Sequence, residues 1–487
     1  MASFGAAPYT SSMLARLDSI PQLSGAVPVL GHLAEMQHRM RFVKHLGREV
    51  DRVMRVRSIG RMPLVAVNHP DTIQELLVER HRVFEKSHMI RFALYPLVGE
   101  GLFTSRGDLW KRQRRLMAPL FHPGKLSAFG DDMVACADRT ISSWADGEER
   151  VLLRETTRIT MSVAGKTLFQ ADTFGEADDI GEALTTALDF TADNAPSVLS
   201  VSHLLLHRFL HGIARRIDAP AVEALATRLE RPLFVPGAEG RRLRKAIAFL
   251  DDTVQRMIDS RRASGVSRGD LLSRLLEVRD EDDGERMSDK QVRDEVLTLF
   301  VAGHETTATA LAWSLYLLGR HPDSYAAAQA EADALGHTPS AADLPRLPLL
   351  LRIFKEALRL YPPVYFDGRQ ASADTSLDGV ECPEGTVVLF APYILHRRAD
   401  LWPDPDRFDP DRFLPDAEAR RSRYAWLPFG AGPRICIGMG FALMEGQLIL
   451  ARMLQRARFT LLGDEVPEPS ATLRPKHGVP VRIALRA

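Results

Sequence analysis

Apolar residues recur at i, i+3 and i+4 spacing along most of the chain, which is the pattern of a helix with one buried face. Short stretches that alternate apolar and polar residues, as strands do, occur mainly toward the two ends. Together these patterns predict a mainly α protein with small β-sheets, an α+β fold. The predicted helices cover residues 70–80, 107–118, 128–146, 155–168, 178–192, 242–262, 288–318, 323–335, 349–360 and 437–457.

Three stretches combine strand alternation with Gly and Pro, the residues that mark turns. Residues 52–67 predict a β-hairpin around the sequence SIGRMP. Residues 376–390 and residues 472–485 each predict a further strand pair. The sheets are therefore expected to be short and close to the chain ends.

These elements predict a single domain over residues 1–487 with two lobes. A β-rich N-terminal lobe covers roughly residues 45–70 together with the C-terminal strands, and a helical lobe covers roughly residues 70–360 and 437–457. The run RDEDDGERMS, residues 279–288, is rich in charge and contains no aromatic residue. We expect it to be a solvated loop rather than a domain boundary.

One predicted helix is much longer than the others. Ser288 and Gln291 have the spacing of a capping box, and Gly319 with Pro322 supplies a stop. A helix of roughly 31 residues would be about 46 Å long and would cross the whole molecule. Its apolar part carries adjacent ionisable residues, His304 and Glu305, which are costly in lipid. We therefore expect a buried helix rather than a membrane span.

Composition excludes several classes of protein. Lys+Arg and Asp+Glu both number 63 in a chain of 487 residues, so the charge balance gives no reason to expect nucleic acid or an anionic membrane as partner. The three cysteines form no CxxC pair, which argues against a disulfide framework and for a reducing compartment. The first 23 residues lack the apolar run of a signal peptide. We expect a cytoplasmic protein without a membrane anchor.

The sequence FGAGPRICIG places Cys436 directly before an apolar helical run. A sulfur near a helix N-terminus meets unpaired N–H groups and a positive dipole end, which favour a thiolate. Glycines at 430, 432 and 438 allow the backbone to approach it closely. The alternative is an inert, buried cysteine. Cys382, beside Pro383 in a predicted turn, has none of this context.

Phe429, Gly432, Arg434, Cys436 and Gly438 match the FxxGxRxCxG haem loop, so the chain resembles the cytochrome P-450 superfamily. Three further motifs of that family follow its usual order and cover nearly the whole chain. The resemblance implies a long central helix over a buried haem, with Cys436 as the axial ligand of the iron. It also implies that Phe429 and Gly430 belong to the haem-binding loop.

The motif WKRQR places Trp110 and Arg114 on one helix face, where the resemblance implies contact with a haem propionate. The alternative is a surface arginine packed on an indole. Arg434 and Arg369 are implied as propionate partners. His396 is a third candidate, with a hydrogen-bonded loop histidine as its alternative.

The motif AGHETT lies in the middle of the long helix. Thr306 can bond back to the carbonyl of Ala302, which bends a helix and opens a groove for oxygen. Glu305, about 100° further round the helix, is expected to face a water path and relay protons while Thr306 orders water. The alternative is a set of capped polar groups lining a cavity.

The motif KEALR predicts an ion pair between Glu356 and Arg359, which are three residues apart on one helix face. Such pairs are also common on surfaces. The resemblance implies a buried triad with Arg412, next to Asp411 where many relatives carry Glu. Its role would be structural, clamping the segment that carries the cysteine loop.

The resemblance implies a haem-thiolate monooxygenase that inserts one oxygen atom of O2 into a fatty acid, terpene, steroid or polyketide-like molecule by hydroxylation or epoxidation. The cofactor would be haem b, and electrons would come from a separate ferredoxin or flavodoxin with its NAD(P)H reductase. The expected substrate pocket is formed by Leu97, Val98, Ala302, Val364 and Phe366. A basic docking face, or an ordinary charged surface, is formed by Lys111, Arg112, Arg115, Arg420, Arg421 and Arg423.

His203, His207 and His211 recur at four-residue spacing and are not typical of the family. They can chelate a metal on one helix face or line a solvent face or an entry lid. A zinc-binding interaction protein is therefore one rival interpretation. A non-catalytic haem sensor or carrier is a second rival, and a peroxygenase, which would not need the acid and alcohol of HETT, is a third.

Overall fold

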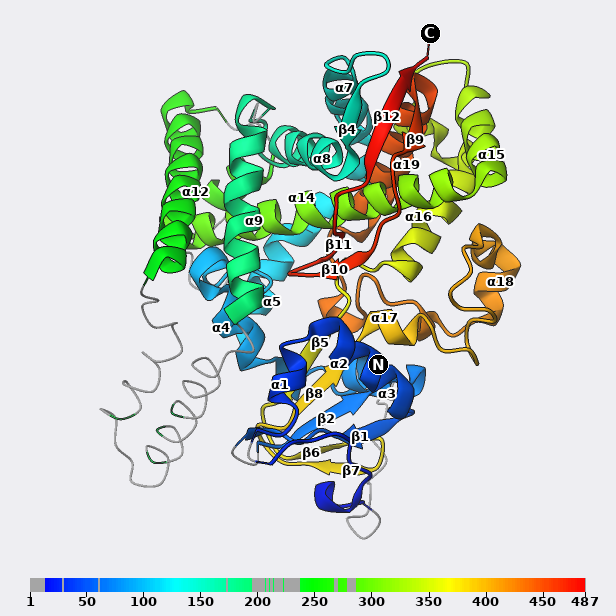
Figure 1. The fold of residues 1–487 in the computed structure, drawn as a ribbon. Helices are drawn as coiled ribbons and strands as arrows, with labels where there is room; N and C mark the ends of the chain where they lie inside the picture. The colour runs from blue at the N-terminus through cyan, green and yellow to red at the C-terminus, as the bar shows by residue number, and fades with distance from the viewer. Residues whose placement is uncertain are drawn as a thin grey trace, which may run out of the picture.

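The computed structural model describes residues 14–28, 30–59, 62–171, 174–194, 237–266, 270–277 and 286–486, with residues 206, 210, 213 and 222. A helical lobe stands above a smaller lobe that contains the largest sheet (Figure 1). The helices are α1 (Leu33–Met36), α2 (Arg39–Glu49), α3 (Pro70–Gln74), α4 (His88–Val98), α5 (Gly107–Met117), α6 (Pro123–Leu126), α7 (Gly130–Ile141), α8 (Leu152–Phe169), α9 (Ala177–Asn194), α12 (Gly237–Ser264), α13 (Leu271–Glu277), α14 (Asp289–Arg320), α15 (Pro322–Asp333), α16 (Pro348–Leu360), α17 (Pro392–Leu395), α18 (Pro415–Arg420) and α19 (Met439–Arg456).

The mainly α prediction is confirmed, and each of the ten predicted helical stretches contains a helix. The apolar periodicity missed α2, α4 and α13, and it also missed the short helices α1, α6, α17 and α18. In α4 the internal Pro96 argues against a helix, because it cannot donate the usual backbone hydrogen bond. Ser87 stabilises the N-terminus of α4, where its hydroxyl accepts the amide of Ile90.

The strands are β1 (Val53–Arg55), β2 (Leu64–Val67), β3 (Phe84–Lys86), β4 (Glu149–Val151), β5 (Asp367–Ala371), β6 (Thr375–Leu377), β7 (Val380–Cys382), β8 (Val387–Phe390), β9 (Ala457–Leu461), β10 (Pro467–Pro469), β11 (Leu473–Pro475) and β12 (Pro480–Leu485). The five-stranded sheet has the order β1-β2-β8-β5-β3, and the remaining strands form smaller sheets. The β1–β2 hairpin is confirmed, with Val53 opposite Val67.

The other predicted strand pairs are only partly correct. β6 pairs with β7, but β8 leaves them and runs parallel to β2. The predicted pairing within residues 472–485 is wrong, since β11 pairs with β10 while β12 pairs with β9 along Val481 to Leu485. The C-terminal strands therefore do not join the N-terminal sheet. Strand pairing depends on partners distant in sequence, which local alternation does not specify.

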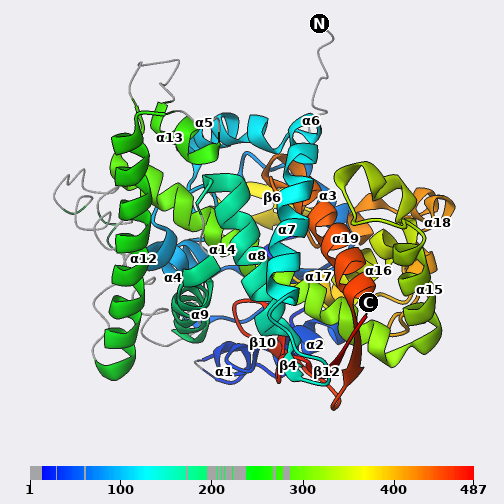
Figure 2. The same cartoon turned by 90° about the horizontal axis from the view of Figure 1, so that it is seen from above.

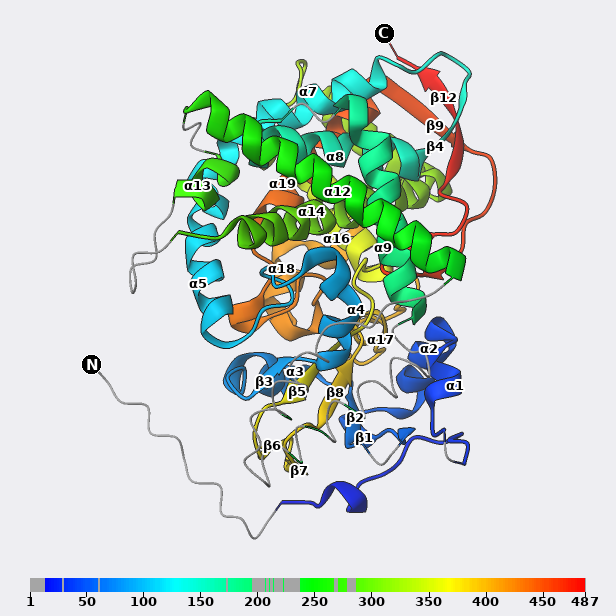
Figure 3. The ribbon, with the colours of Figure 1, turned by 90° about the vertical axis from the view of Figure 1, so that its left-hand side faces the viewer.

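Helix α14 crosses the helical lobe, and α12 and α9 lie on one side of it (Figures 1 and 3). Its predicted capping box is confirmed, because the Ser288 hydroxyl and the Gln291 side chain each accept the other's backbone amide. Seen from above, α8 lies along α14 (Figure 2). Thr160 on α8 donates to the carbonyl of His304 at 2.7 Å and fixes the two helices together. Among the described helices, none is both long and apolar enough to span a bilayer.

Helix α16 presents a fully buried ion pair. Arg359 donates to both carboxylate oxygens of Glu356, at 2.6 and 2.8 Å, and both side chains are 0% exposed. Arg412 approaches Glu356 to 3.5 Å, so the structure brings the three predicted side chains together. The remaining guanidinium N–H groups of Arg359 donate to backbone carbonyls. These belong to His396, Pro405 and Arg407.

The loop before α19 passes directly against the π-helical turn Glu75–Glu79. Gly432 has a φ of +69°, and a Cβ on it would stand 1.9 Å from the carbonyl oxygen of Leu77. Gly430 has a φ of +70°, but a Cβ there would meet nothing within 4 Å. The two glycines therefore have different reasons for being glycine. One allows a backbone turn, while the other also allows close contact between two chain segments.

Glu356→Gln is expected to lower the free energy of unfolding by about 3–5 kcal/mol, because it leaves Arg359 as an uncompensated buried charge. Glu418→Gln is the matched control, since Glu418 on α18 binds Lys355 on α16 at 2.8 Å but its side chain is 37% exposed. That change should cost about 0–1 kcal/mol. Urea unfolding of the two variants measures the difference, and equal losses would contradict the buried-charge argument.

Gly432→Ala is expected to destabilise the protein more than Gly430→Ala. Both substitutions place alanine in a left-handed backbone conformation, which costs about 1–2 kcal/mol. Only the first adds a clash with backbone, which costs about 1–3 kcal/mol more. Thermal unfolding midpoints of the two variants test this order, and an equal shift would show that the contact with Leu77 is not tight.

Candidate active site

Cys436 lies in the turn between the loop glycines and α19. Its amide donates to the carbonyl of Phe429 at 2.9 Å, which closes the loop around the side chain. Burial raises the pKa of the Cys436 thiol, while a hydrogen bond from the Gly438 backbone and the charge of Arg114 act in the opposite direction. The predicted stabilisation of a thiolate by the loop is therefore present, but burial outweighs it in the protein alone. A bound metal ion would reverse this balance.

Cys436 is exposed as a residue, although the surrounding protein raises the pKa of its thiol by burial. A similar opening occurs in the middle of α14, where Ala302 is exposed and Thr306 is half-buried between buried neighbours. Ala302 thus presents surface from a helix that is otherwise packed largely into the core, and Cys436 presents surface from the loop before α19. Such surface lets a bound group reach the sulfur and the central helix.

The Thr306 hydroxyl donates to the carbonyl of Ala302 at 2.6 Å, as predicted from the motif. Glu305 is buried, and its Oε1 accepts the hydroxyl of Thr472 at 2.8 Å. Its Oε2 has no hydrogen-bond partner among the described residues. Burial raises the pKa of Glu305, so this carboxyl keeps its proton to a higher pH than a free glutamate. The contact with Thr472 could not be read from the motif.

Several cations gather between β3, β5 and the cysteine loop. The guanidinium of Arg434 lies 4.3 Å from the centre of the Trp110 ring and donates to the carbonyl of Ser105 at 3.0 Å. Burial lowers its pKa to about 10, and the charge of Arg369 acts in the same direction. Arg434 rather than Arg114 is therefore the cation that covers Trp110. Arg114 is half-buried, and its charge acts on the Cys436 thiol.

The sequence did not indicate two members of this cluster, Lys86 and Asp367. Lys86 and Arg369 both bind Asp367, at 3.0 and 2.8 Å. Lys86 is 7% exposed, and burial lowers its pKa to about 8. Strand alternation was the available signal, because Phe84 and Lys86 lie on the buried face of β3. The cluster therefore has two buried cations, Lys86 and Arg369, and the half-buried Arg434, close to the half-buried carboxylate of Asp367.

His396 is a hydrogen-bonded loop histidine, the alternative that the sequence left open. Its Nε2 accepts the amide of Leu427 at 2.8 Å, and its Nδ1 lies 3.1 Å from the carbonyl oxygen of Arg359. Burial lowers the pKa of His396 to about 3, so the ring is neutral. Both nitrogens are used, which excludes the predicted propionate contact. The ring connects α16 to the segment that leads into the cysteine loop.

The predicted pocket residues differ in how much of their surface is exposed. Leu97 and Val98 are 0% and 2% exposed and pack in the main core, so they present no surface to a pocket. Leu97 and Val98 are the residues of α4 that are buried. Val364 is 37% exposed. Phe366 is half-buried and packs edge-on against Phe42, with ring centres 6.3 Å apart.

The predicted basic face also needs one correction. Arg421 stacks over Trp402 at 3.8 Å and donates to the carbonyl of Arg412. Its guanidinium is therefore engaged within the protein and does not belong to a docking face for a redox partner. Arg112 is half-buried, whereas the other four residues are exposed: Lys111, Arg115, Arg420 and Arg423. His203, His207 and His211 lie outside the described residues. Within the described residues no group of three or more His, Cys, Asp or Glu could hold a metal ion.

Comparison with known proteins gives a consistent result. The cytochrome P450 family model matches residues 21–480. Pentalenene oxygenase of Streptomyces avermitilis is 35% identical over 467 residues, which cover 95% of this chain and 96% of that protein. Cyclooctat-9-en-7-ol 5-monooxygenase of Streptomyces melanosporofaciens is 37% identical over 457 residues, covering 92% and 90% of the two chains. The crystal structure of the cytochrome P450DA heme domain superimposes with a TM-score of 0.80 at 27% identity, covering 98% and 99%.

These matches confirm the resemblance that the cysteine loop indicated. The chain therefore belongs to the cytochrome P450 family and is an oxygen-incorporating, haem-dependent monooxygenase of hydrophobic substrates.

Proposed function

We propose that the chain acts as a single catalytic domain in the cytoplasm and inserts one oxygen atom of O2 into a terpene-like molecule. Haem b would be held by Cys436, and electrons would come from a separate protein. The observation that carries this proposal is the exposed Cys436, which lies two residues from Arg434 in the cluster of cations that includes the buried Lys86 and Arg369. None of the three cysteines is in a disulfide, as expected in a reducing compartment.

The residues present fit haem b. A haem carries two propionates. Lys86 and Arg369 are buried and bind Asp367, while the half-buried Arg434 is influenced by the negative charges of Glu85 and Asp367. The lowered pKa values of Lys86 and Arg434 reflect buried positive charge that is not fully compensated. Two propionates would supply the missing negative charge. The sequence has no CxxC pair for covalent haem attachment, which favours haem b.

When bound through a thiolate, haem supplies the electron donation that favours cleavage of the O–O bond. The chain supplies position and protons. Gly430 and Gly432 allow the left-handed turns of the loop that carries Cys436, and Trp110 with Arg434 would hold the propionate side. Thr306, anchored on Ala302, would orient water. Glu305, protonated to a higher pH than usual, would donate protons.

The relatives support a terpene among the four substrate classes that the motifs allow. Two of them are named for pentalenene and for cyclooctat-9-en-7-ol. Ala302 and Val364 offer exposed apolar surface for such a molecule. Hydroxylation of a hydrophobic ring system is the reaction that this surface and the family chemistry support together.

The electron donor is proposed to be an acidic ferredoxin or flavodoxin, reduced by an NAD(P)H reductase. Exposed basic residues on α5 and near α18 support such docking, because opposite charges steer association. These residues are Lys111, Arg115, Arg420 and Arg423. A haem sensor or carrier is the alternative, and it differs by forming no product when electrons are supplied.

Cys436→Ser is expected to abolish the thiolate-type absorption band of the reduced, carbon monoxide-bound protein, because serine cannot donate a thiolate to iron. Cys136→Ser is the matched control. Cys136 is half-buried on α7, and burial raises the pKa of its thiol to about 12, which suits an unreactive cysteine. Survival of the band in the first variant, or its loss in the second, would refute the assignment of Cys436.

Titration of the ferric protein with pentalenene and related cyclic terpenes is expected to change the spin state of the iron, since an apolar ligand displaces water. Fatty acids, steroids and macrolides serve as comparison ligands. Product analysis after supply of ferredoxin, reductase and NADPH should then show one added oxygen atom. A response confined to another ligand class would refute the terpene proposal. Binding without product would favour the carrier.

A further inference from the structure

The carboxyl of Glu305 is held by an element other than its own helix. Thr472, 6% exposed in the turn between β10 and β11, donates its hydroxyl to Glu305 Oε1 at 2.8 Å. This leaves Oε2 without a partner among the described residues. A buried carboxyl with one fixed oxygen and one unengaged oxygen has a defined orientation and a position left for a proton.

An ion pair lies behind this contact. Arg474 on β11 binds Asp189 on α9 at 3.1 Å and Glu468 on β10 at 3.1 Å. The hydroxyl of Ser470 also donates to Asp189. The positive charge of Arg474 lowers the pKa of Glu305, and the negative charge of Asp189 raises it. Two opposite charges outside α14 therefore act on one buried carboxyl.

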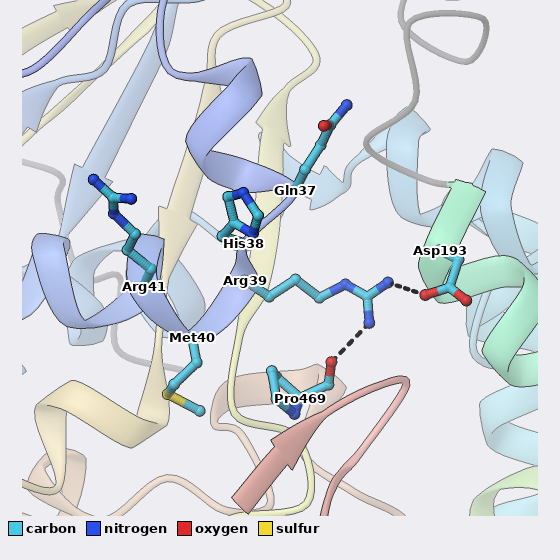
Figure 4. A pocket seen from close by; sticks show the side chains of 7 residues that line it. All are labelled: Gln37, His38, Arg39, Met40, Arg41, Asp193 and Pro469. Atoms are coloured by element: carbon cyan, nitrogen blue, oxygen red, sulfur yellow. Dashed lines mark hydrogen bonds and ion pairs between the residues drawn. The ribbon is translucent and has the colours of Figure 1, made fainter.

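The hairpin that carries Thr472 is fixed on several sides. Leu473 is fully buried, its carbonyl accepts the indole N–H of Trp313 at 2.9 Å, and its amide donates to Pro363. On the outer side Arg39 donates to the carbonyl of Pro469 and to Asp193, both at 2.7 Å (Figure 4). These contacts border a pocket of about 370 Å³. A turn held in this way can keep a side chain in one place.

We propose that Thr472, with the Arg474–Asp189 ion pair behind it, positions the Glu305 carboxyl for proton delivery. The proposal rests on the proposed monooxygenase function. The O–H bond at Oε2 breaks, its proton passes to water beside Thr306, and solvent returns a proton to the carboxylate. The electrons of the reaction come from the reductase and its carrier. Thr472 is a positioning residue, because it acts through Glu305.

The charged groups around Glu305 give the sign of each effect. The neighbouring His304 stays neutral, since burial lowers its pKa to about 4 and its Nδ1 lies 2.9 Å from the carbonyl of Phe300. Glu468 lies behind Arg474. Removing the charge of Arg474 should therefore raise the pKa of Glu305, and removing the charge of Asp189 should lower it. Activity that needs the protonated carboxyl is lost as pH rises through that pKa.

The test measures product formed per NADPH consumed as a function of pH. Arg474→Gln should move the alkaline loss of coupled turnover to higher pH, and Asp189→Asn should move it to lower pH. Arg482→Gln is the matched control, because Arg482 is 58% exposed on β12 and pairs with Glu149 at 2.7 Å. It should leave the profile unchanged. Shifts in one common direction, or none, would overturn the proposal.

A second pair of variants tests the hydroxyl itself. Thr472→Val should reduce coupled turnover roughly tenfold, less than the about 100-fold that a complete loss of acid catalysis costs, and should release more hydrogen peroxide. Thr472→Ser keeps the hydroxyl and should restore coupling. Equal behaviour of the two variants would overturn the proposal.

The absorption spectrum of the reduced, carbon monoxide-bound protein identifies variants that have lost the haem site. An unaltered protein that binds haem but forms no product would refute the proposed function. Normal product formation without the predicted differences among variants would refute only the role of Thr472 and its ion pair.

Discussion

The buried guanidinium of Arg359 joins α16 to the chain segment that leads to the cysteine loop. A buried cation must be fully paired, and Arg359 uses both oxygens of Glu356 and three backbone carbonyls to achieve this. Those carbonyls belong to the segment that leads toward the cysteine loop. His396 then connects the carbonyl of Arg359 to the amide of Leu427. The segment that leads to the cysteine loop is thus held in place by the pairing of one buried charge on α16.

A cluster of positive charge also favours binding of the cofactor. Lys86 and Arg369 are buried beside the carboxylate of Asp367, with the half-buried Arg434 close to them, and this gathering of positive charge is unfavourable for the protein alone. Burial also raises the pKa of the Cys436 thiol. A group that brings two carboxylates and a metal ion would relieve both costs at once. Haem binding and stability of the folded chain should therefore be coupled.

The sequence predicted the parts of the site that depend on local spacing. The back-bond from Thr306 to Ala302 spans four residues, and the Glu356–Arg359 pair spans three. Contacts across the fold were not predictable in this way. Thr472 and Glu305 are 167 residues apart in the sequence. Strand β12 pairs with β9 rather than with β11, its neighbour in the sequence. The inward direction of Leu97 and Val98 depended on the packing of α4, which periodicity alone did not define.

X-ray absorption at the iron edge of the purified ferric protein decides whether Cys436 binds the haem iron, because it reports which elements are bonded to iron. We predict one sulfur neighbour, present in the unaltered protein and absent in Cys436→Ser. An iron bonded only to nitrogen and oxygen in the unaltered protein would contradict this prediction, as would a sulfur neighbour that persists after the substitution.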